Sequence, residues 1–301
     1  MRSASNRVRR ARPSLGTFVE ITARGDNETK LHDAIDRAFN AIARVDRQMS
    51  FHHPDSDVSR INRDAFQRKV KVDPWTWRVL HAAQELSHET DGIFDITVAR
   101  KLMQWKYLPR RYRNVSEGNW RDIVLEKNCT VRFRRRVIVD LGGIAKGFAV
   151  DRAVKALKCA GVRSGVVNAG GDLRVFGLKS ELVHLRHPAK PMRPAGAITL
   201  RERALATSGI YFAQKRRGSA VISSLLDGRT RRCSRKLVSV SVAAPVCMIA
   251  DALTKAVFVL REKSAPLLAR YDADALLLEG DGAPSWMFRS LCDTSDRTGF
   301  D

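Results

Sequence analysis

The sequence is poor in cysteine and has no long apolar run. Its five cysteines are scattered, odd in number and without a C-x-x-C pair, which argues against a disulfide framework and against a zinc site. No segment approaches the roughly 20 apolar residues of a transmembrane helix, and no apolar stretch follows the arginines of residues 1–13. We therefore expect reduced thiols, no membrane span, no signal peptide and a cytoplasmic location.

Acidic residues are also scarce, because 32 Asp and Glu stand against 54 Lys and Arg, giving a net charge of +22. The whole excess lies in residues 1–13, 100–136 and 201–236. Such a field attracts polyanions or an anionic cofactor, and it is equally compatible with solvated arginine-rich surface loops. Basic motifs with interleaved aromatic residues are absent, so we expect no nucleic-acid partner.

A chain of 301 residues, 44% of them hydrophobic, is long enough for a large core. We predict one domain over residues 14–290, after a flexible basic segment at 1–13. Apolar periodicity and cap signals predict helices over 28–47, 74–89, 145–161 and 248–261. Strands are predicted over 14–23, 166–168, 173–176, 183–185, 197–200 and 237–242, the last of them half-exposed. Residues 129–133 and 137–141 are predicted to form a hairpin. A polar loop is predicted over 49–62 and irregular chain over 100–122. This mixture indicates an α/β or α+β fold.

Two glycine pairs follow predicted strands. The run Val137–Val139 ends in Asp140, passes Gly142-Gly143 and opens the helix predicted from Ala145. A second strand ends in Gly170-Gly171 and Asp172. Free amides at a helix start bind phosphate, and glycine permits close approach, so these turns predict a site for a phosphorylated ligand. A tight turn alone would also explain the second pair.

Seven separated blocks together make the chain resemble the ApbE family of FAD:protein FMN transferases, over about residues 14–260. The blocks are Leu15-Gly16-Thr17, Met49 to Asn62, Gly92 to Val98, Asp140 to Gly147, Asn168 to Asp172, Ala206 to Gly209 and Ala250 to Thr254.

The resemblance implies that the chain cleaves FAD at its pyrophosphate with Mg²⁺. It also implies transfer of the FMN half to a Thr or Ser hydroxyl of an acceptor flavoprotein, with release of AMP. The FAD site would be lined by Met49, Ile93, Phe94, Asp95, Asp140, Lys146 and Leu225. The Gly143 carbonyl and the side chains of Asp251 and Thr254 would hold the metal.

The residue types agree with this chemistry, because phosphoryl transfer needs charge neutralisation and Mg²⁺ takes oxygen ligands. Asp251 near a helix start and Thr254 at i+3 share a helical face, and Lys146 adds positive charge at a helix start. Each candidate also has a plainer interpretation. Asp140 would cap the next helix, and Asp251 would be a carboxylate near a helix start that the helix dipole stabilises. Lys146 would be a solvated charge, and Met49 would belong to the core. Asp95 would serve a local turn, and His52 and His53 would be solvated.

The chain departs from the family pattern at two site positions. A histidine that is a candidate base is replaced by Ser224, and a neutral serine cannot accept a proton as imidazole does. Asp227, Asp251 or a metal-bound hydroxide would have to serve instead. The usual metal-binding threonine, four residues after the aspartate, is Lys255. Lysine is a poor Mg²⁺ ligand, so it would weaken metal binding, supply cationic charge itself, or point away while Thr254 binds.

We therefore expect a two-lobed α/β (α+β) protein with mixed sheets and a flavin cleft between the lobes. Flavin transfer is the leading interpretation. The alternative is a protein that binds FAD, or hydrolyses it to FMN and AMP, without transfer. A polyanion-binding protein is the third, and its binding would weaken steeply with salt.

Overall fold

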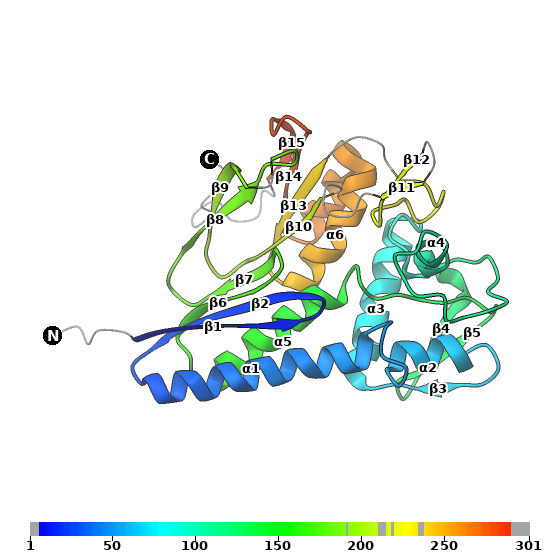
Figure 1. The fold of residues 1–301 in the computed structure, drawn as a ribbon, viewed down its shortest axis with the longest axis horizontal. Coiled ribbons are helices and arrows are strands. Elements are labelled where there is room, and N and C mark those ends of the chain that lie inside the picture. Colours follow the sequence, from blue (N-terminus) through cyan, green and yellow to red (C-terminus); the bar gives the residue numbers. More distant parts are fainter. Residues whose placement is uncertain (1–5, 191, 210–214, 218–219, 234–237, 290–301) are drawn as a thin grey trace. The chain divides into compact units, whose positions relative to one another are not determined.

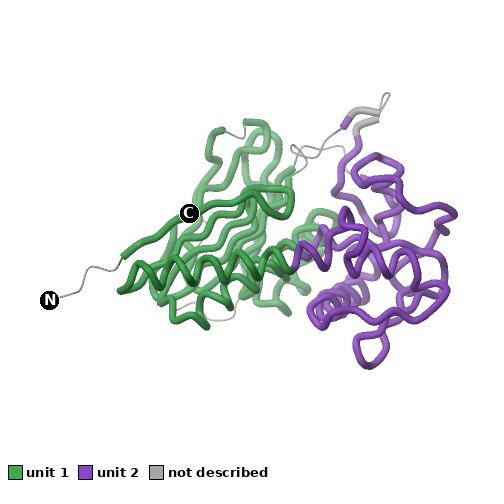
Figure 2. The backbone as a smooth tube through the Cα atoms, turned by 60° about the horizontal axis from the view of Figure 1, so that its bottom comes forward, with its two compact units in different colours: residues 1–44, 146–211, 236–301 green, residues 45–145, 212–235 purple. Residues whose placement is uncertain are grey.

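The computed structural model describes residues 6–190, 192–209, 215–217, 220–233 and 238–289. The chain divides into two compact units, shown in different colours in Figure 2. Unit 1 comprises residues 1–44, 146–211 and 236–301, and unit 2 comprises residues 45–145 and 212–235. Within the described ranges, no helix combines the length and the apolar character that crossing a bilayer requires.

Unit 1 is built on an eight-stranded sheet with the order β1-β2-β6-β7-β10-β13-β14-β15 (Figure 1). Every neighbouring pair is antiparallel, so the predicted α+β class is confirmed and the expectation of mixed sheets is wrong. The strands are β1 Asn6–Ser14, β2 Thr17–Gly25, β6 Ser164–Ala169, β7 Asp172–Phe176, β10 Ala204–Gly209, β13 Ser239–Ala244, β14 Asp274–Leu278 and β15 Pro284–Phe288. A separate hairpin joins β8 Glu181–Arg186 to β9 Pro194–Leu200.

The helices of unit 1 are α1 Glu28–Met49, whose last turn belongs to unit 2, α5 Ala145–Cys159, α6 Cys247–Leu260, the 3₁₀ turn η4 Arg261–Ser264 and α7 Ala265–Arg270. Helix α6 packs against β10 and β13. On the alternate residues of the same strands, Leu205 and Ala243 join one core cluster with Leu185 and Ile198 of the β8–β9 hairpin. Strand β13 is therefore buried along its whole length rather than half-exposed as predicted; its predicted first residue, Leu237, lies outside the described residues.

Unit 2 carries short elements joined by long loops. They are α2 Asp57–Asp64, β3 Val70–Lys71, α3 Pro74–Glu89, the 3₁₀ turns η1 Ile96–Val98 and η2 Trp120–Asp122, α4 Ala99–Gln104, β4 Ile123–Glu126, β5 Thr130–Phe133, β11 Lys215–Arg217 and β12 Ala220–Ile222. One small sheet has the order β3-β5-β4, and β11 pairs with β12. Helix α3 begins where the sequence predicts, because the Asp73 side chain caps it and Pro74 occupies its first turn.

Two segments that were predicted to lack regular secondary structure contain a strand and a helix. The basic segment expected to be flexible forms β1 from Asn6 onward, paired along its whole length with β2; residues 1–5 lie outside the described part. The predicted polar loop over 49–62 contains α2, whose start is fixed by the Ser56 hydroxyl accepting from the Ser59 amide at 3.0 Å. Its polar residues conceal the periodicity, because Ser59 and Asn62 are buried beside Val58 and Ile61.

The segment 137–141, predicted as a hairpin strand, is not one. β5 pairs with β3 and β4 instead. The backbone of Val139 is satisfied by a side chain, because its amide donates to Asn62 Oδ1 at 2.7 Å and its carbonyl accepts from Asn62 Nδ2 at 2.8 Å. Asn62 thus takes the place of a neighbouring strand for the residue that precedes Asp140.

Replacing Asn62 by alanine should therefore be costly. Val139 is fully buried, so both of its backbone groups would lose their partners. We expect the free energy of unfolding to fall by about 2–4 kcal/mol, measured by urea denaturation. Asn40→Ala, at an exposed position of α1, is the matched control and should change stability by less than about 0.5 kcal/mol. Equal effects of the two substitutions would contradict this role for Asn62.

Candidate functional site

Helices α5 and α6 approach each other closely at the start of α5. A Cβ placed on Gly147 would lie 2.3 Å from the Cys247 carbonyl oxygen and 2.9 Å from Asp251 Cβ, so the contact requires glycine. The Gly147 amide lies in the first turn of α5, where it has no intrahelical acceptor. It donates to Asp251 Oδ2 at 3.1 Å. The glycine motif thus positions a carboxylate of α6 at the start of α5.

Asp151, one turn further along α5, holds the start of α6. Its Oδ1 accepts from the Cys247 amide at 3.0 Å, and its Oδ2 accepts from the Met248 amide at 2.9 Å. The same carboxylate pairs with Arg174 of β7 at 2.6 Å. No side chain of α6 itself caps this helix start. Asp151 therefore fixes the register between α5, α6 and the sheet, and with it the position of Asp251.

Four charged side chains meet around this contact. Lys146 donates to Asp172 at the start of β7, and Lys255 donates to Asp251 one turn back on α6. The Lys255 ammonium also donates to the Asp251 carbonyl oxygen at 2.9 Å. We call Lys146, Asp172, Asp251 and Lys255 the four-charge cluster. Lys146 is therefore not simply a solvated charge, and its partner is Asp172, which the sequence analysis placed at the end of the second glycine turn without giving it a role.

Hydroxyl groups extend the cluster toward the sheet. Thr254 Oγ1 donates to the Asp251 carbonyl oxygen at 2.6 Å, and it lies 2.8 Å from Ser208 Oγ of β10. Thr254 and Asp251 are almost completely buried. Asp251 lies one turn inside α6, which begins at Cys247, so it is not the helix-start residue that the sequence predicted. Its partners are side-chain and backbone donors rather than the helix dipole.

The ionisation of the cluster follows from its pairing. Burial acts to raise the pKa of Asp251, but the charges of Lys255 and Lys146 outweigh it and hold the pKa below its usual value. Burial acts to lower the pKa of Lys146, and Asp172 and Asp251 together raise it above its usual value. Burial and the Asp251 charge raise the pKa of Asp172 to about 6. The two lysines and the two aspartates of the cluster thus form two ion pairs.

The Asp251 oxygen atoms expected to bind Mg²⁺ already accept hydrogen bonds from the protein. A carboxylate and a hydroxyl are suitable oxygen ligands, but both carboxylate oxygens of Asp251 accept from protein donors, one of them the Lys255 ammonium. Within the described ranges, no three His, Cys, Asp or Glu side chains lie close enough together to hold a metal ion. Gly143 belongs to the turn before α5, in unit 2. As arranged in unit 1, Asp251 and Thr254 do not fit a Mg²⁺ site.

Unit 2 contains a cavity of about 770 Å³ with a cationic wall. Its lining draws on two of the three basic segments that the sequence singles out, 100–136 and 201–236. The cationic side chains are Arg100, Lys101, Arg121, Arg135, Arg229 and Arg231, against the acidic Asp91, Asp95 and Glu117. The excess of positive charge in a partly enclosed space suits an anionic ligand.

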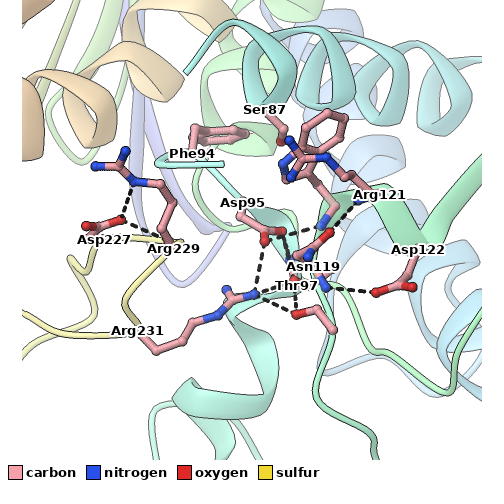
Figure 3. A network of polar contacts seen from close by, with 12 residues as sticks. Ser87, Phe94, Asp95, Thr97, Asn119, Arg121, Asp122, Asp227, Arg229 and Arg231 are labelled. Carbon is pink, nitrogen blue, oxygen red and sulfur yellow. Dashed lines mark hydrogen bonds and ion pairs between the residues drawn. The ribbon is translucent and has the colours of Figure 1, made fainter. Parts of the chain in front are cut away.

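Asp95 organises the wall of this cavity (Figure 3). Its Oδ1 accepts from the amide and the hydroxyl of Thr97, both at 2.8 Å, and its Oδ2 accepts from the Trp120 amide at 3.3 Å and from Arg231 at 3.0 Å. Burial raises the pKa of Asp95 despite the neighbouring Arg231 charge. Asp95 thus serves a local turn, the plainer of its two interpretations, and orients Arg231.

The other predicted FAD-lining residues of unit 2 lie elsewhere. Met49, Ile93, Phe94 and Leu225 have buried side chains, and none of them lines the cationic cavity. For Met49, burial agrees with its interpretation as a core residue.

Asp140 occupies the turn before α5. Desolvation raises its pKa to about 6, against a hydrogen bond from the Gly142 amide and the nearby charge of His52. Its carboxylate thus engages the glycine turn within unit 2, and its own amide donates to the Ile96 carbonyl at 2.9 Å. His52 and His53 are exposed, as the solvated interpretation predicts.

The second glycine pair closes the β6–β7 hairpin rather than opening a helix. Gly170 and Gly171 have φ angles of +62° and +104°, which favour glycine, and the Gly171 amide donates to Asn168 Oδ1 at 3.0 Å. The interpretation of this pair as a tight turn is therefore confirmed. The turn's contribution to the site is indirect, because it places Asp172 at the start of β7, opposite Lys146.

The candidate replacements for the missing histidine differ in the hydrogen bonds that their side-chain oxygen atoms already accept. Ser224 is half-buried in unit 2. Asp227, three residues later, accepts from the Arg229 amide at 2.8 Å through Oδ1, and the same oxygen lies 3.7 Å from Arg229 Nε. Asp251 has both carboxylate oxygens engaged.

The sequence profile of the ApbE family matches residues 15–277. The chain belongs to the ApbE family. Two relatives named FAD:protein FMN transferase are each 28% identical to it. The Rhodobacter capsulatus protein aligns over 277 residues, 84% of this chain and 51% of its own length, so the chain spans about half of that relative. The Vibrio cholerae protein aligns over 288 residues, 88% of this chain and 85% of its own length.

Solved structures of ApbE proteins share the fold. The ApbE protein of Thermotoga maritima superposes with a TM-score of 0.83 at 28% identity, covering 95% of this chain and 97% of that one. The flavin transferase ApbE of Vibrio cholerae gives a TM-score of 0.79 at 25% identity, covering 96% and 98%. The predicted ApbE-like α+β fold is therefore confirmed over nearly the whole chain.

Proposed function

We propose that this ApbE-family protein transfers FMN from FAD to a Thr or Ser hydroxyl of an acceptor flavoprotein and releases AMP. The observation that carries the proposal is the family match over residues 15–277, together with relatives named for this reaction. The four-charge cluster supports it independently. Lys146 stands in the first turn of α5, where helix amides and a lysine favour a phosphate group.

The proposed reaction balances as a displacement at phosphorus. The acceptor hydroxyl oxygen bonds to the phosphorus of the FMN half, and the bond from that phosphorus to the bridging oxygen breaks. AMP leaves with the bridging oxygen and its electron pair, and the hydroxyl proton passes to a base. Such a transfer depends on positioning and on neutralising the phosphate charge, which fixed ammonium groups supply.

The residues proposed to line FAD remain those that the family resemblance implies: Met49, Ile93, Phe94, Asp95, Asp140, Lys146 and Leu225. The side chains of Met49, Ile93, Phe94 and Leu225 are buried, so FAD would meet the backbone atoms of these residues. Asp95 would act by orienting Arg231 rather than by direct contact, since four donors already engage it. Asp227 is the proposed base, because Asp251 has no unengaged carboxylate oxygen.

The family resemblance implies that the reaction depends on Mg²⁺. The contacts of the residues expected to bind the metal do not support this dependence. Gly143, Asp251 and Thr254 are the residues that the resemblance names. Asp251 is paired with Lys255, so no step of the proposed reaction is assigned to a metal ion.

The test combines FAD, the purified protein and an acceptor domain that carries a flavinylation site. In-gel flavin fluorescence on the acceptor and AMP in solution are the two readouts. Lys146→Met should lower both by at least about 100-fold, because it removes the charge proposed to face the pyrophosphate. Lys158→Met is the matched control: Lys158 lies on the same helix in an exposed pair with Glu202. Undiminished transfer by Lys146→Met would contradict the proposed role.

Ser224 favours one alternative, in which water replaces the acceptor hydroxyl. A chain without the family histidine would then hydrolyse FAD to FMN and AMP. This alternative predicts AMP release with no fluorescent acceptor, whichever acceptor domain is supplied. Fluorescent acceptor together with equimolar AMP establishes the transferase.

A further inference from the structure

Lys255 lies where a cation bound to Asp251 would lie. It is four residues after Asp251 on α6, so the two side chains share one helical face. Its ammonium donates to Asp251 Oδ1 and, at 2.9 Å, to the Asp251 carbonyl oxygen. The Asp251 side chain is only 1% exposed and that of Lys255 is 19% exposed, so the pair is shielded from solvent.

The remaining oxygen atoms of this site are satisfied by other protein donors. Asp251 Oδ2 accepts from the Gly147 amide at 3.1 Å. The Asp251 carbonyl also accepts from the Thr254 hydroxyl at 2.6 Å, and Thr254 lies 2.8 Å from Ser208 Oγ. A divalent cation would have to displace the Lys255 ammonium and compete with an amide for the same carboxylate.

The charge balance of the four-charge cluster also disfavours a divalent cation at Asp251. Lys146 and Lys255 match Asp172 and Asp251, so the four-charge cluster is neutral as it stands. A divalent cation added to it would leave two buried positive charges uncompensated, which is costly in a low-dielectric interior. An uncharged residue at position 255 would instead leave one net negative charge, the state that favours a cation.

We propose that the Lys255 ammonium is the permanent cation of this site, so that the protein binds no divalent cation at Asp251. On the proposed function, on which this second part rests, Lys255 takes the position of a metal ion beside Asp251 and flavin transfer proceeds without a metal ion. Lysine serves as a compact point charge for phosphate in many proteins, and it differs from a metal ion in being covalently fixed.

The test is a titration of the purified full-length protein with Mn²⁺, which substitutes for Mg²⁺ and is counted by its electron paramagnetic resonance signal. The wild-type protein should show no Asp251-dependent site up to about 1 mM Mn²⁺. Lys255→Thr should gain one site per chain, at least about tenfold tighter than any wild-type binding, and Asp251→Asn in the same chain should remove it. Lys158→Thr, at a side chain that is 44% exposed, should behave as the wild type.

Two results would overturn the proposal. One is a wild-type site that Asp251→Asn abolishes, a measurement that does not depend on the folding of any Lys255 variant. The other is a Lys255→Thr protein with a native circular dichroism spectrum that binds no Mn²⁺. Lys255→Arg, which keeps the charge, should exclude Mn²⁺ like the wild type.

The activity arm separates this inference from the proposed function. Flavin transfer and AMP release by the wild type should persist in excess EDTA, and activity that returns only with Mg²⁺ would contradict the second part of the proposal. If no condition yields AMP or labelled acceptor, the proposed function fails, while the Mn²⁺ titration still decides whether Lys255 occupies the cation position.

Discussion

Asp251→Ala should abolish flavin transfer and lower the free energy of unfolding by about 3–5 kcal/mol. The substitution removes the partner of a largely buried lysine and the acceptor of the Gly147 amide in one step. It also removes a negative charge that raises the pKa of Lys146. Urea denaturation measures the stability, and the acceptor fluorescence assay measures the transfer.

A double variant distinguishes loss of the ion pair from loss of packing. Lys255→Met keeps the length of the side chain and removes its charge. If the pair is as described, Asp251→Ala with Lys255→Met should cost at least about 1 kcal/mol less than the two single substitutions added together, because the double variant leaves no unpaired charge. Additive costs would mean that Asp251 and Lys255 do not interact, and the cation assignment would fail with them.

Regular periodicity made most of the helices predictable. Helices α1, α3, α5 and α6 begin and end within a few residues of their predicted bounds, because a continuous apolar stripe marks each one, and α3 also has a capping aspartate and a proline at its start. Helix α2 was not predicted, because its buried face includes polar side chains that form hydrogen bonds with distant backbone atoms, as Asn62 does with Val139. The apolar run 137–139 was predicted as a strand, although the backbone of Val139 pairs with the Asn62 side chain rather than with a neighbouring strand. Sequence periodicity does not reveal such a partner.

The site was predictable residue by residue but not in its pairing. The sequence identifies Lys146 and Asp251 as candidates, yet Asp172 becomes a partner of Lys146 only when the β6–β7 hairpin and α5 pack together, 26 residues apart. For Lys255 the sequence leaves three alternatives open. The fold places its ammonium on Asp251, so the alternative in which Lys255 points away is not the one observed. Pairing at i, i+4 on a helix is a signal that could have favoured this outcome.

Gly147→Ala should destabilise the protein by about 3 kcal/mol or more, although alanine favours a helix over glycine by roughly 1 kcal/mol. The reason is steric. The new methyl group would lie 2.3 Å from the Cys247 carbonyl oxygen, and that oxygen belongs to backbone whose position Asp151 fixes. Relief requires α5 and α6 to separate, which would lengthen the hydrogen bond from the Gly147 amide to Asp251.

The matched control is Gly196→Ala in β9, where an added Cβ meets nothing within 4 Å. It should change the free energy of unfolding by less than about 0.5 kcal/mol. A Gly147→Ala protein as stable as the wild type would show that the two helices are further apart than described. A folded but destabilised Gly147→Ala protein should also lose flavin transfer more than its stability explains at 25 °C, because the separation moves Asp251 and Lys255 of α6 away from Lys146 at the start of α5. Loss of transfer in proportion to unfolding alone would mean that the close contact serves stability and not the reaction.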